Sequence, residues 1–313
     1  MISIVIPLYN KEKEIQNTLN SIFNQTFQDF EIVIVNDGST DHSVEVVKQI
    51  NDSRIRLIEQ VNQGVSAARN TGIKEAKYDY IALLDADDEW KPTYLETQLD
   101  LINSFAECSV FACAYEFRRG EKTIQLILNR IPFEGEKGIL SNYFEVASCS
   151  HPPICSINIV AKKEAFLAVG GFPVGIKSGE DLLTWARLAV RYEIAYSLKN
   201  LAVFIGIPSE PGKSKPMERY NEKDEVLIGL TELYNTLPDN TMKNHLKQYI
   251  FRWYKIQCVI LLQINNPGKC ISKSLGAISK GGDLLVFGSL VILSCLPWGF
   301  SMRLLGRKKK KYK

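Results

Sequence analysis

The chain has 313 residues, of which 45% are hydrophobic and 23% are charged, and its formal net charge is +3. This length predicts one large domain or two ordinary ones, and the composition excludes a collagen, a disordered acidic chain and a small disulfide scaffold. Residues 307–313 alone hold six basic side chains, which leaves a net charge of −3 on residues 1–306. Because a mildly acidic body with a basic tail is not a general nucleic-acid binder, we expect no nucleic-acid partner.

The seven cysteines are scattered along the chain, and no two of them form a Cys-X-X-Cys pair. This pattern argues against a disulfide framework or a zinc site and favours reduced thiols in a cytosolic protein. The segment from Met1 to Pro7 lacks the basic start of a signal peptide and predicts a strand instead. We therefore expect a cytoplasmic location.

Apolar strand-like runs alternate with helical patterns over the first hundred residues. The predicted strands are 2–6, 30–35, 54–58 and 80–84, and the predicted helices are 12–23, 43–50 (capped by Thr40 or Asp41), 65–76 and one opened by Pro92. Strict alternation predicts an α/β fold with a mostly parallel central sheet flanked by helices.

The later residues predict a mixed region and then a helical one. Strands are expected at 110–117, 154–160 and 194–205, and helices at 162–169, 181–191, 223–234 and 242–262. Residues 208–216 are rich in Pro, Gly, Ser and Lys, which is typical of a loop or linker. We therefore expect a catalytic domain over 1–212 and a C-terminal helical extension over 213–313.

Polar clusters follow three of the predicted strands, at 7–10, 36–41 and 85–88. In open α/β sheets, ligands bind beyond the carboxyl ends of the strands. Three clusters at one edge therefore indicate a binding site, whereas one alone is often only a capped loop.

Asp85 and Asp87 form an Asp-X-Asp (DXD) motif directly after an apolar strand. Two such carboxylates suit Mg²⁺ or Mn²⁺, which takes a few protein oxygens and completes its shell with water and substrate phosphates. The alternative for this motif alone is a solvated acidic turn before the helix at Pro92.

Four segments of the chain resemble the family-two inverting glycosyltransferases of GT-A fold, in order and in spacing. They are Val5-Ile6-Pro7-Leu8-Tyr9-Asn10, Ile34-Val35-Asn36-Asp37-Gly38-Ser39-Thr40-Asp41, Asn62-Gln63-Gly64-Val65-Ser66-Ala67-Ala68-Arg69-Asn70 and Leu84-Asp85-Ala86-Asp87-Asp88. The resemblance covers about residues 1–100 and extends weakly to about 205.

The resemblance implies a nucleotide-sugar donor. It implies that Asp37 accepts a hydrogen bond from the nucleobase of this donor, usually uracil. It implies that Pro7, Tyr9 and Asn10 line the nucleotide pocket and that Arg69 lies near the base or the phosphates. It also implies that Asp85 lies near the ribose and the metal and that Asp87 binds the metal, Mn²⁺ or Mg²⁺.

An inverting transfer needs a base for the acceptor hydroxyl, and family members carry a Glu-Asp pair after a Gly-rich turn. Here Glu180 and Asp181 follow Gly170-Gly171-Phe172-Pro173. The resemblance makes Asp181 the candidate base, while Glu180 contacts the acceptor or orients the site. The alternative is that Asp181 is only the N-cap of the next helix.

The resemblance has one gap, because relatives carry a Tyr-Arg pair and a His- or Ser-rich loop where this chain has residues 204–209. Substitute phosphate contacts are Ser209, Lys213, Ser214 or Lys215. Residues 206–214 resemble a P-loop, but five residues rather than four separate the two glycines, and two of these five are prolines. We therefore do not interpret this stretch as a P-loop.

Residues 284–302 are mostly apolar and contain no acidic or basic side chain. The basic tail 303–313 follows them. As one helix this segment is borderline for a membrane span, and Pro297 and Gly299 would interrupt it. We expect a helix lying on an anionic membrane surface, with the protein peripherally attached to the cytoplasmic face. The alternative is a buried core helix with a solvated tail.

Together these features predict a metal-dependent glycosyltransferase of the hexosyl or N-acetylhexosaminyl class, acting on a saccharide or lipid-linked acceptor in cell-surface polysaccharide synthesis. One alternative is a catalytically silent nucleotide-sugar-binding or membrane scaffold protein of the same fold. A nucleotidyltransferase would need a Gly-rich basic loop after the first strand, and residues 7–10 are not such a loop.

Overall fold

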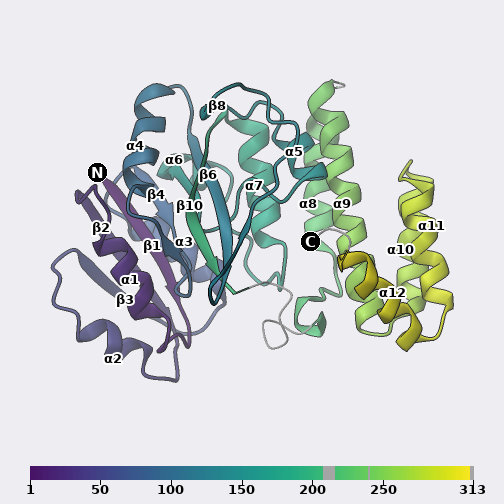
Figure 1. Cartoon of the computed structure of the whole chain (residues 1–313), viewed down its shortest axis with the longest axis horizontal. Helices are drawn as coiled ribbons and strands as arrows, with labels where there is room; N and C mark the ends of the chain where they lie inside the picture. Colours follow the sequence, from purple (N-terminus) through teal and green to yellow (C-terminus); the bar gives the residue numbers. More distant parts are fainter. Residues whose placement is uncertain (207–215, 239, 311–313) are drawn as a thin grey trace. The chain divides into compact units, whose positions relative to one another are not determined.

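The computed structural model describes residues 1–206, 216–238 and 240–310 (Figure 1). The chain divides into two compact units, Met1–Glu210 and Pro211–Lys313. The predicted boundary at 212/213, the candidate phosphate contacts Ser209, Lys213, Ser214 and Lys215, and most of the P-loop-like stretch lie outside the described residues.

The first unit is built on a ten-stranded sheet over residues 1–206, with the order β3-β2-β1-β4-β9-β6-β10-β5, β7 pairing with β6 and β8 with β10. The strands are β1 (Ile2–Leu8), β2 (Phe30–Asp37), β3 (Ile55–Gln60), β4 (Tyr80–Leu83), β5 (Glu89–Trp90), β6 (Val110–Arg119), β7 (Lys122–Gln125), β8 (Lys137–Ile139), β9 (Ile159–Lys162) and β10 (Ile194–Ile205).

The sheet is mixed, and its parallel part positions the site. Strands β3, β2, β1 and β4 pair in parallel, and so do β6 and β10. Strand β9 runs antiparallel between β4 and β6, so β6 and β10 point the same way as β1. The carboxyl ends of these strands therefore lie at one edge of the sheet, the carboxyl edge. The predicted α/β fold with a central sheet flanked by helices is confirmed, but the sheet is mixed rather than mostly parallel, because β5, β7, β8 and β9 pair antiparallel with their neighbours.

Helices cover this sheet because its strands are apolar on both faces. They are α1 (Ile15–Phe23), α2 (Ser43–Lys48), α3 (Val65–Glu75), α4 (Tyr94–Ser104), α5 (Tyr143–Cys149), α6 (Lys163–Ala168) and α7 (Glu180–Arg191). Alternate residues of β1, such as Ile4 and Ile6, pack in one core cluster with Leu19 of α1. Val5 faces Gly72 of α3 instead, and a Cβ at Gly72 would clash with it, so glycine lets α3 lie close to the sheet.

The structure corrects the prediction of a strand over 154–160. Strand β9 begins only at Ile159, and the preceding residues form a turn held by the Asn158 amide. Asn158 Oδ1 accepts from the Cys155 backbone N–H at 2.8 Å, and Nδ2 donates to the Pro153 carbonyl at 2.8 Å. The apolar run is buried without being extended.

Two predicted helix caps also differ. The N-cap of α2 is His42, although Asp41 Oδ1 does accept from the Ser43 N–H at 3.0 Å. The N-cap of α7 is Gly179 in the left-handed region at φ +87°, so Glu180 and Asp181 lie in the first helical turn. The interpretation of Asp181 as an N-cap is therefore wrong.

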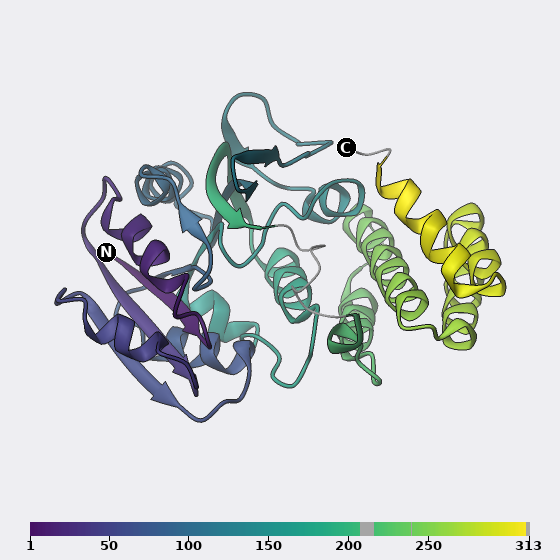
Figure 2. The ribbon, with the colours of Figure 1, turned by 60° about the horizontal axis from the view of Figure 1, so that its bottom comes forward.

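The second unit is helical in its described residues. Its α-helices are α8 (Glu225–Thr236), α9 (Thr241–Gln263), α10 (Pro267–Ser279), α11 (Leu284–Cys295) and α12 (Trp298–Lys310). Helices α10 and α11 pack against each other and against α9, at the yellow-green end of the ribbon (Figure 2). Asp224 caps α8, accepts from Trp253 Nε1 at 2.9 Å and forms an ion pair with Lys273.

The apolar segment 284–302 forms two helices. Helix α11 ends at Cys295, before Pro297, whereas Gly299 lies inside α12 and does not interrupt it. Among the described residues no helix combines the length and the apolar character that a membrane crossing requires.

Candidate active site

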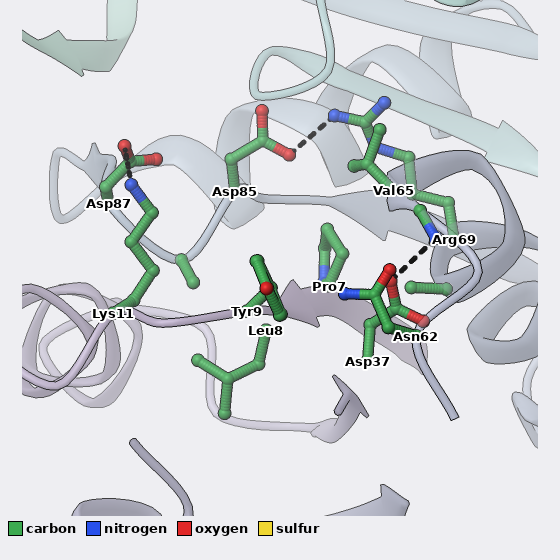
Figure 3. A pocket seen from close by; sticks show the side chains of 13 residues that line it. Pro7, Leu8, Tyr9, Lys11, Asp37, Asn62, Val65, Arg69, Asp85 and Asp87 are labelled. Atoms are coloured by element: carbon green, nitrogen blue, oxygen red, sulfur yellow. Dashed lines mark hydrogen bonds and ion pairs between the residues drawn. The ribbon is translucent and has the colours of Figure 1, made fainter. Parts of the chain in front are cut away.

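A cavity of about 390 Å³ opens at the carboxyl edge, where the polar clusters after β1, β2 and β4 meet the start of α3 (Figure 3). Six of the predicted site residues line it: Pro7, Tyr9, Asp37, Arg69, Asp85 and Asp87. The other lining residues are Leu8, Lys11, Asn62, Gly64, Val65, Ala68 and Ala86.

Asp37 is the last residue of β2, and its side chain is held by the segment that precedes α3. Oδ1 accepts from Gln60 Nε2 at 2.7 Å and from the Gln63 N–H at 2.9 Å, and Oδ2 accepts from the Gly64 N–H at 2.8 Å. The carboxylate is 3% exposed, so these bonds fix its direction. The Asp37 side chain is thus a rigid acceptor on the cavity wall.

Asn10 is not among the residues that line the cavity. Its backbone lies in the left-handed region at φ +51°. Its N–H donates to Ser39 Oγ at 3.1 Å, and its Oδ1 accepts from the Thr40 N–H at 2.8 Å. Asn10 therefore ties the loop after β1 to the loop after β2, beside the predicted pocket.

Asp85 and Arg69 form the buried centre of the site. Arg69 Nη2 donates to Asp85 Oδ1 at 2.7 Å, and Ser156 Oγ donates to Asp85 Oδ2 at 2.8 Å. Arg69 is 4% exposed, and its guanidinium also lies over the Phe172 ring, 5.1 Å from the centroid. Its Nε and Nη1 make no hydrogen bond among the described residues. Arg69 thus lines the cavity as a buried, firmly held side chain, and its predicted position near the base or phosphates stays a prediction.

Asp87 points away from Asp85 toward the loop after β1 (Figure 3). Lys11 Nζ lies 2.7 Å from Asp87 Oδ2, and both side chains are partly exposed to the cavity. Burial lowers the pKa of Lys11, but the hydrogen bond and charge of Asp87 outweigh it, so the net shift is upward. Sequence reasoning missed Lys11 because a lysine after a strand carries no signal of its own.

Glu180, the first residue of α7, forms an ion pair with the same arginine, and Asp181 follows it in the first helical turn. Arg69 Nη1 lies 3.6 Å from Glu180 Oε1, while Asp181 Oδ1 accepts from the Leu182 N–H at 2.8 Å. Arg69 therefore links Asp85 on the cavity wall to Glu180, the neighbour of the candidate base Asp181.

Burial perturbs both carboxyl groups of this pair. It raises the pKa of Glu180 to about 7, helped by the charge of Asp181 and opposed by Arg69. Burial also raises the pKa of Asp181, again against the charge of Arg69. A carboxyl group with a raised pKa is a better proton acceptor near neutral pH, which suits general-base chemistry.

Asn70 positions the start of α7, a role that the sequence did not indicate. Its Nδ2 donates to the Phe172 carbonyl at 2.7 Å, and its Oδ1 accepts from the Phe172 N–H at 2.8 Å. Gly171 lies beside it at φ +65°, where a Cβ would stand 2.5 Å from Asn70 Oδ1. The turn before α7 is thus clamped to α3, next to Arg69.

The chemistry of the cavity wall fits a hard divalent cation. Asp85 and Asp87 supply carboxylate oxygens, and the cavity leaves room for water and phosphate oxygens. No such cation is needed to hold the wall together, because Arg69, Ser156 and Lys11 already bond to these carboxylates.

The sequence matches the model of glycosyl transferase family 2 over residues 3–170, which is more than half of the chain. The chain belongs to this family. The match ends before Glu180 and Asp181.

Curated relatives share the N-terminal part. Glycosyltransferase GlyA of Streptococcus pneumoniae is 40% identical over 122 residues, covering 38% of this chain and 18% of the relative. Chondroitin synthase of Pasteurella multocida is 38% identical over 121 residues, covering 38% of this chain and 12% of the relative. The matched stretch is thus a small part of either relative.

Solved structures share the fold. The TarS fragment 1–349 of S. aureus in complex with UDP-GlcNAc matches with a TM-score of 0.63 and 19% identity, covering 87% of this chain and 81% of that one. Mannosyltransferase PcManGT of Pyrobaculum calidifontis, in complex with GDP-Man and Mn²⁺, matches with a TM-score of 0.58 and 18% identity, covering 93% and 78%.

Proposed function

We propose that this glycosyltransferase is an inverting, metal-dependent enzyme that moves a hexosyl or N-acetylhexosaminyl group from a UDP-sugar to a saccharide or lipid-linked acceptor. The observation that carries the proposal is the buried Arg69, which contacts Asp85 on the cavity wall and Glu180 at the start of α7. Through this contact, Glu180 and the candidate general base Asp181 lie close to the candidate donor pocket.

In this proposal, Asp181 removes the proton from the acceptor hydroxyl, whose oxygen attacks the anomeric carbon on the side opposite the departing diphosphate. Glu180 orients the acceptor, and the raised pKa of both carboxyl groups supports proton transfer near neutral pH. Asp85 and Asp87 hold Mn²⁺ or Mg²⁺, which when bound neutralises charge on the diphosphate.

The choice of donor and pathway draws on the relatives. The TarS complex contains UDP-GlcNAc, and the PcManGT complex contains Mn²⁺, which supports a nucleotide sugar and a divalent metal. The likeness to chondroitin synthase supports a place in polysaccharide synthesis. We propose that Asp37 accepts a hydrogen bond from the nucleobase, and Pro7 and Tyr9 line the same cavity.

The test is a donor screen with the purified full chain and Mn²⁺, with UDP release and acceptor glycosylation as readouts. Asp181→Asn should lower turnover roughly a hundred- to ten-thousandfold and leave UDP affinity unchanged. Glu164→Gln, an exposed acidic side chain in the first turn of α6, is the matched control and should behave as wild type. Near-normal turnover in Asp181→Asn would remove its role as base.

The screen also decides between catalysis and the scaffold alternative. A chain that binds UDP, yet releases none from any nucleotide sugar in the presence of acceptor and metal, would be a silent binding protein. Retention or inversion at the anomeric carbon of the product, read by NMR, tests the inverting mechanism separately.

We further propose a peripheral location at the cytoplasmic face of an anionic membrane, through the second unit. Helix α11 exposes large apolar side chains, with Leu285 84% and Ile292 64% exposed, and the basic residues of 303–313 follow. Apolar insertion combined with basic side chains is a known mode of reversible anchoring.

Flotation of the full chain with vesicles tests this location. Leu285→Glu with Ile292→Glu should weaken binding to phosphatidylglycerol-containing vesicles by about tenfold or more, because two apolar side chains no longer insert. Leu167→Glu, which changes an exposed leucine of α6, is the control. Equal binding of the double variant and the wild type would rule out α11 as the contact.

A further inference from the structure

Lys11 reaches the second aspartate of the DXD motif from the opposite wall of the cavity (Figure 3). Its Nζ lies 2.7 Å from Asp87 Oδ2, and its side chain is 33% exposed. Its backbone is fixed, because the Lys11 N–H donates to Ser43 Oγ at 2.7 Å and its carbonyl accepts from the Ile15 N–H at 3.0 Å. Only the flexible side chain is free to change direction.

Among the described residues that line the cavity, the basic side chains of Arg69 and Lys11 differ in this freedom. Arg69 is 4% exposed and is held by Asp85, Glu180 and the Phe172 ring. Lys11 has a flexible four-carbon stem, and its ammonium is open to the cavity. The Arg69 guanidinium is therefore held more firmly than the Lys11 ammonium, which has one ion-pair partner among the described residues and is partly exposed.

A divalent cation and an ammonium group compete for one carboxylate, because both need its oxygens and repel each other at contact distance. A metal held by Asp87 would take the place of Lys11 Nζ. The displaced ammonium stays within reach of the cavity, where the anionic diphosphate of a donor would lie.

We propose that Lys11 is an exchangeable counter-ion, which neutralises Asp87 before the metal binds and then becomes a ligand of the donor diphosphate. This inference rests on the proposed metal-dependent function. It makes metal binding weak in the free protein and stronger once a diphosphate is present, since the diphosphate accepts the displaced charge. Lys11 is thus a positioning residue that couples metal and donor binding.

The experiment compares wild type with Lys11→Met in the full chain. Mn²⁺ binding without nucleotide is titrated by electron paramagnetic resonance, and UDP binding at saturating Mn²⁺ by calorimetry. Lys11→Met should bind Mn²⁺ about tenfold more tightly and UDP about fivefold less tightly, because it removes both the competitor and the diphosphate ligand. Lys11→Arg should restore UDP affinity.

Lys91→Met is the matched control. Lys91 Nζ lies 2.7 Å from Glu116 Oε2 with a side-chain exposure of 36%, close to that of Lys11, but it does not line the cavity. This variant should leave both affinities unchanged.

Two results would overturn the inference in distinguishable ways. If Lys11→Met binds Mn²⁺ no more tightly than wild type while wild type binds Mn²⁺ with UDP present, Lys11 is not a competitor and the metal-dependent function stands. If wild type binds UDP but never Mn²⁺, the metal dependence itself fails, and Lys11 is the permanent cation of the site.

Discussion

Glu180→Gln should stabilise the folded protein at alkaline pH, although it removes a carboxyl group from the candidate active site. The pKa of the Glu180 carboxyl is raised from 4.5 to about 7, mainly by burial. The folded state therefore keeps a proton that the unfolded state has already lost, and stability falls as pH rises through this window. The loss over the window is about 3 kcal/mol, at about 1.4 kcal/mol per pH unit.

The sign follows from which state binds the proton. Below pH 4.5 both states are protonated, and a neutral Gln of the same shape changes little. Above pH 7 the wild type carries a buried charge that Gln lacks, so the free energy of unfolding of Glu180→Gln should exceed that of wild type by up to about 3 kcal/mol.

Urea unfolding of both proteins at several pH values between 5 and 8 measures this difference. Glu164→Gln on the exposed first turn of α6 is the control, and its difference from wild type should not depend on pH. A difference that stays constant across the range, or a less stable Glu180→Gln at pH 8, would refute the burial argument.

Two further substitutions test the supports of each unit. Asn70→Ala removes both hydrogen bonds to the Phe172 backbone, so we expect a loss of about 2 kcal/mol in urea unfolding and a larger fall in kcat than in donor affinity. An unchanged kcat would show that the hydrogen bonds between Asn70 and Phe172 are not needed to position α7. Asp224→Ala removes the cap of α8 and leaves the partly buried Lys273 and Trp253 Nε1 without their partner, so calorimetry should show a loss of about 3 kcal/mol. A Tm equal to that of wild type would contradict this.

The edge that carries the cavity was predictable because it follows from local patterns alone. Apolar strands alternating with helices imply parallel pairing, and parallel pairing brings the residues after β1, β2 and β4 together. Asp37 and Asp85 could therefore be placed near each other before any contact was known. The carboxyl ends of β6 and β10 joined the same edge through β9, whose antiparallel course has no signal in the strand sequence itself.

The supports of the site were not predictable because they join residues far apart in the chain. Asn70 contacts Phe172 across 102 positions, and Ser156 contacts Asp85 across 71. Asn70 lies in the predicted helix over 65–76 and Ser156 in the predicted strand over 154–160, but no local pattern indicates a partner so far away in the chain. The run around Ser156 forms a turn instead, since the Asn158 side chain satisfies backbone groups that a strand would have paired.

In the proposed role of Asp37 as a hydrogen-bond acceptor for the nucleobase, the bonds around it limit which base can bind. A carboxylate has about four lone-pair positions, and Gln60, Gln63 and Gly64 fill three of them. The one that remains, on Oδ2, matches a base with a single ring N–H, such as uracil. Guanine presents a ring N–H and an adjacent amino group, and its second donor would find no free acceptor on this carboxylate. In this proposal, discrimination between uracil and guanine donors depends on the one lone pair of Asp37 that Gln60, Gln63 and Gly64 leave unoccupied.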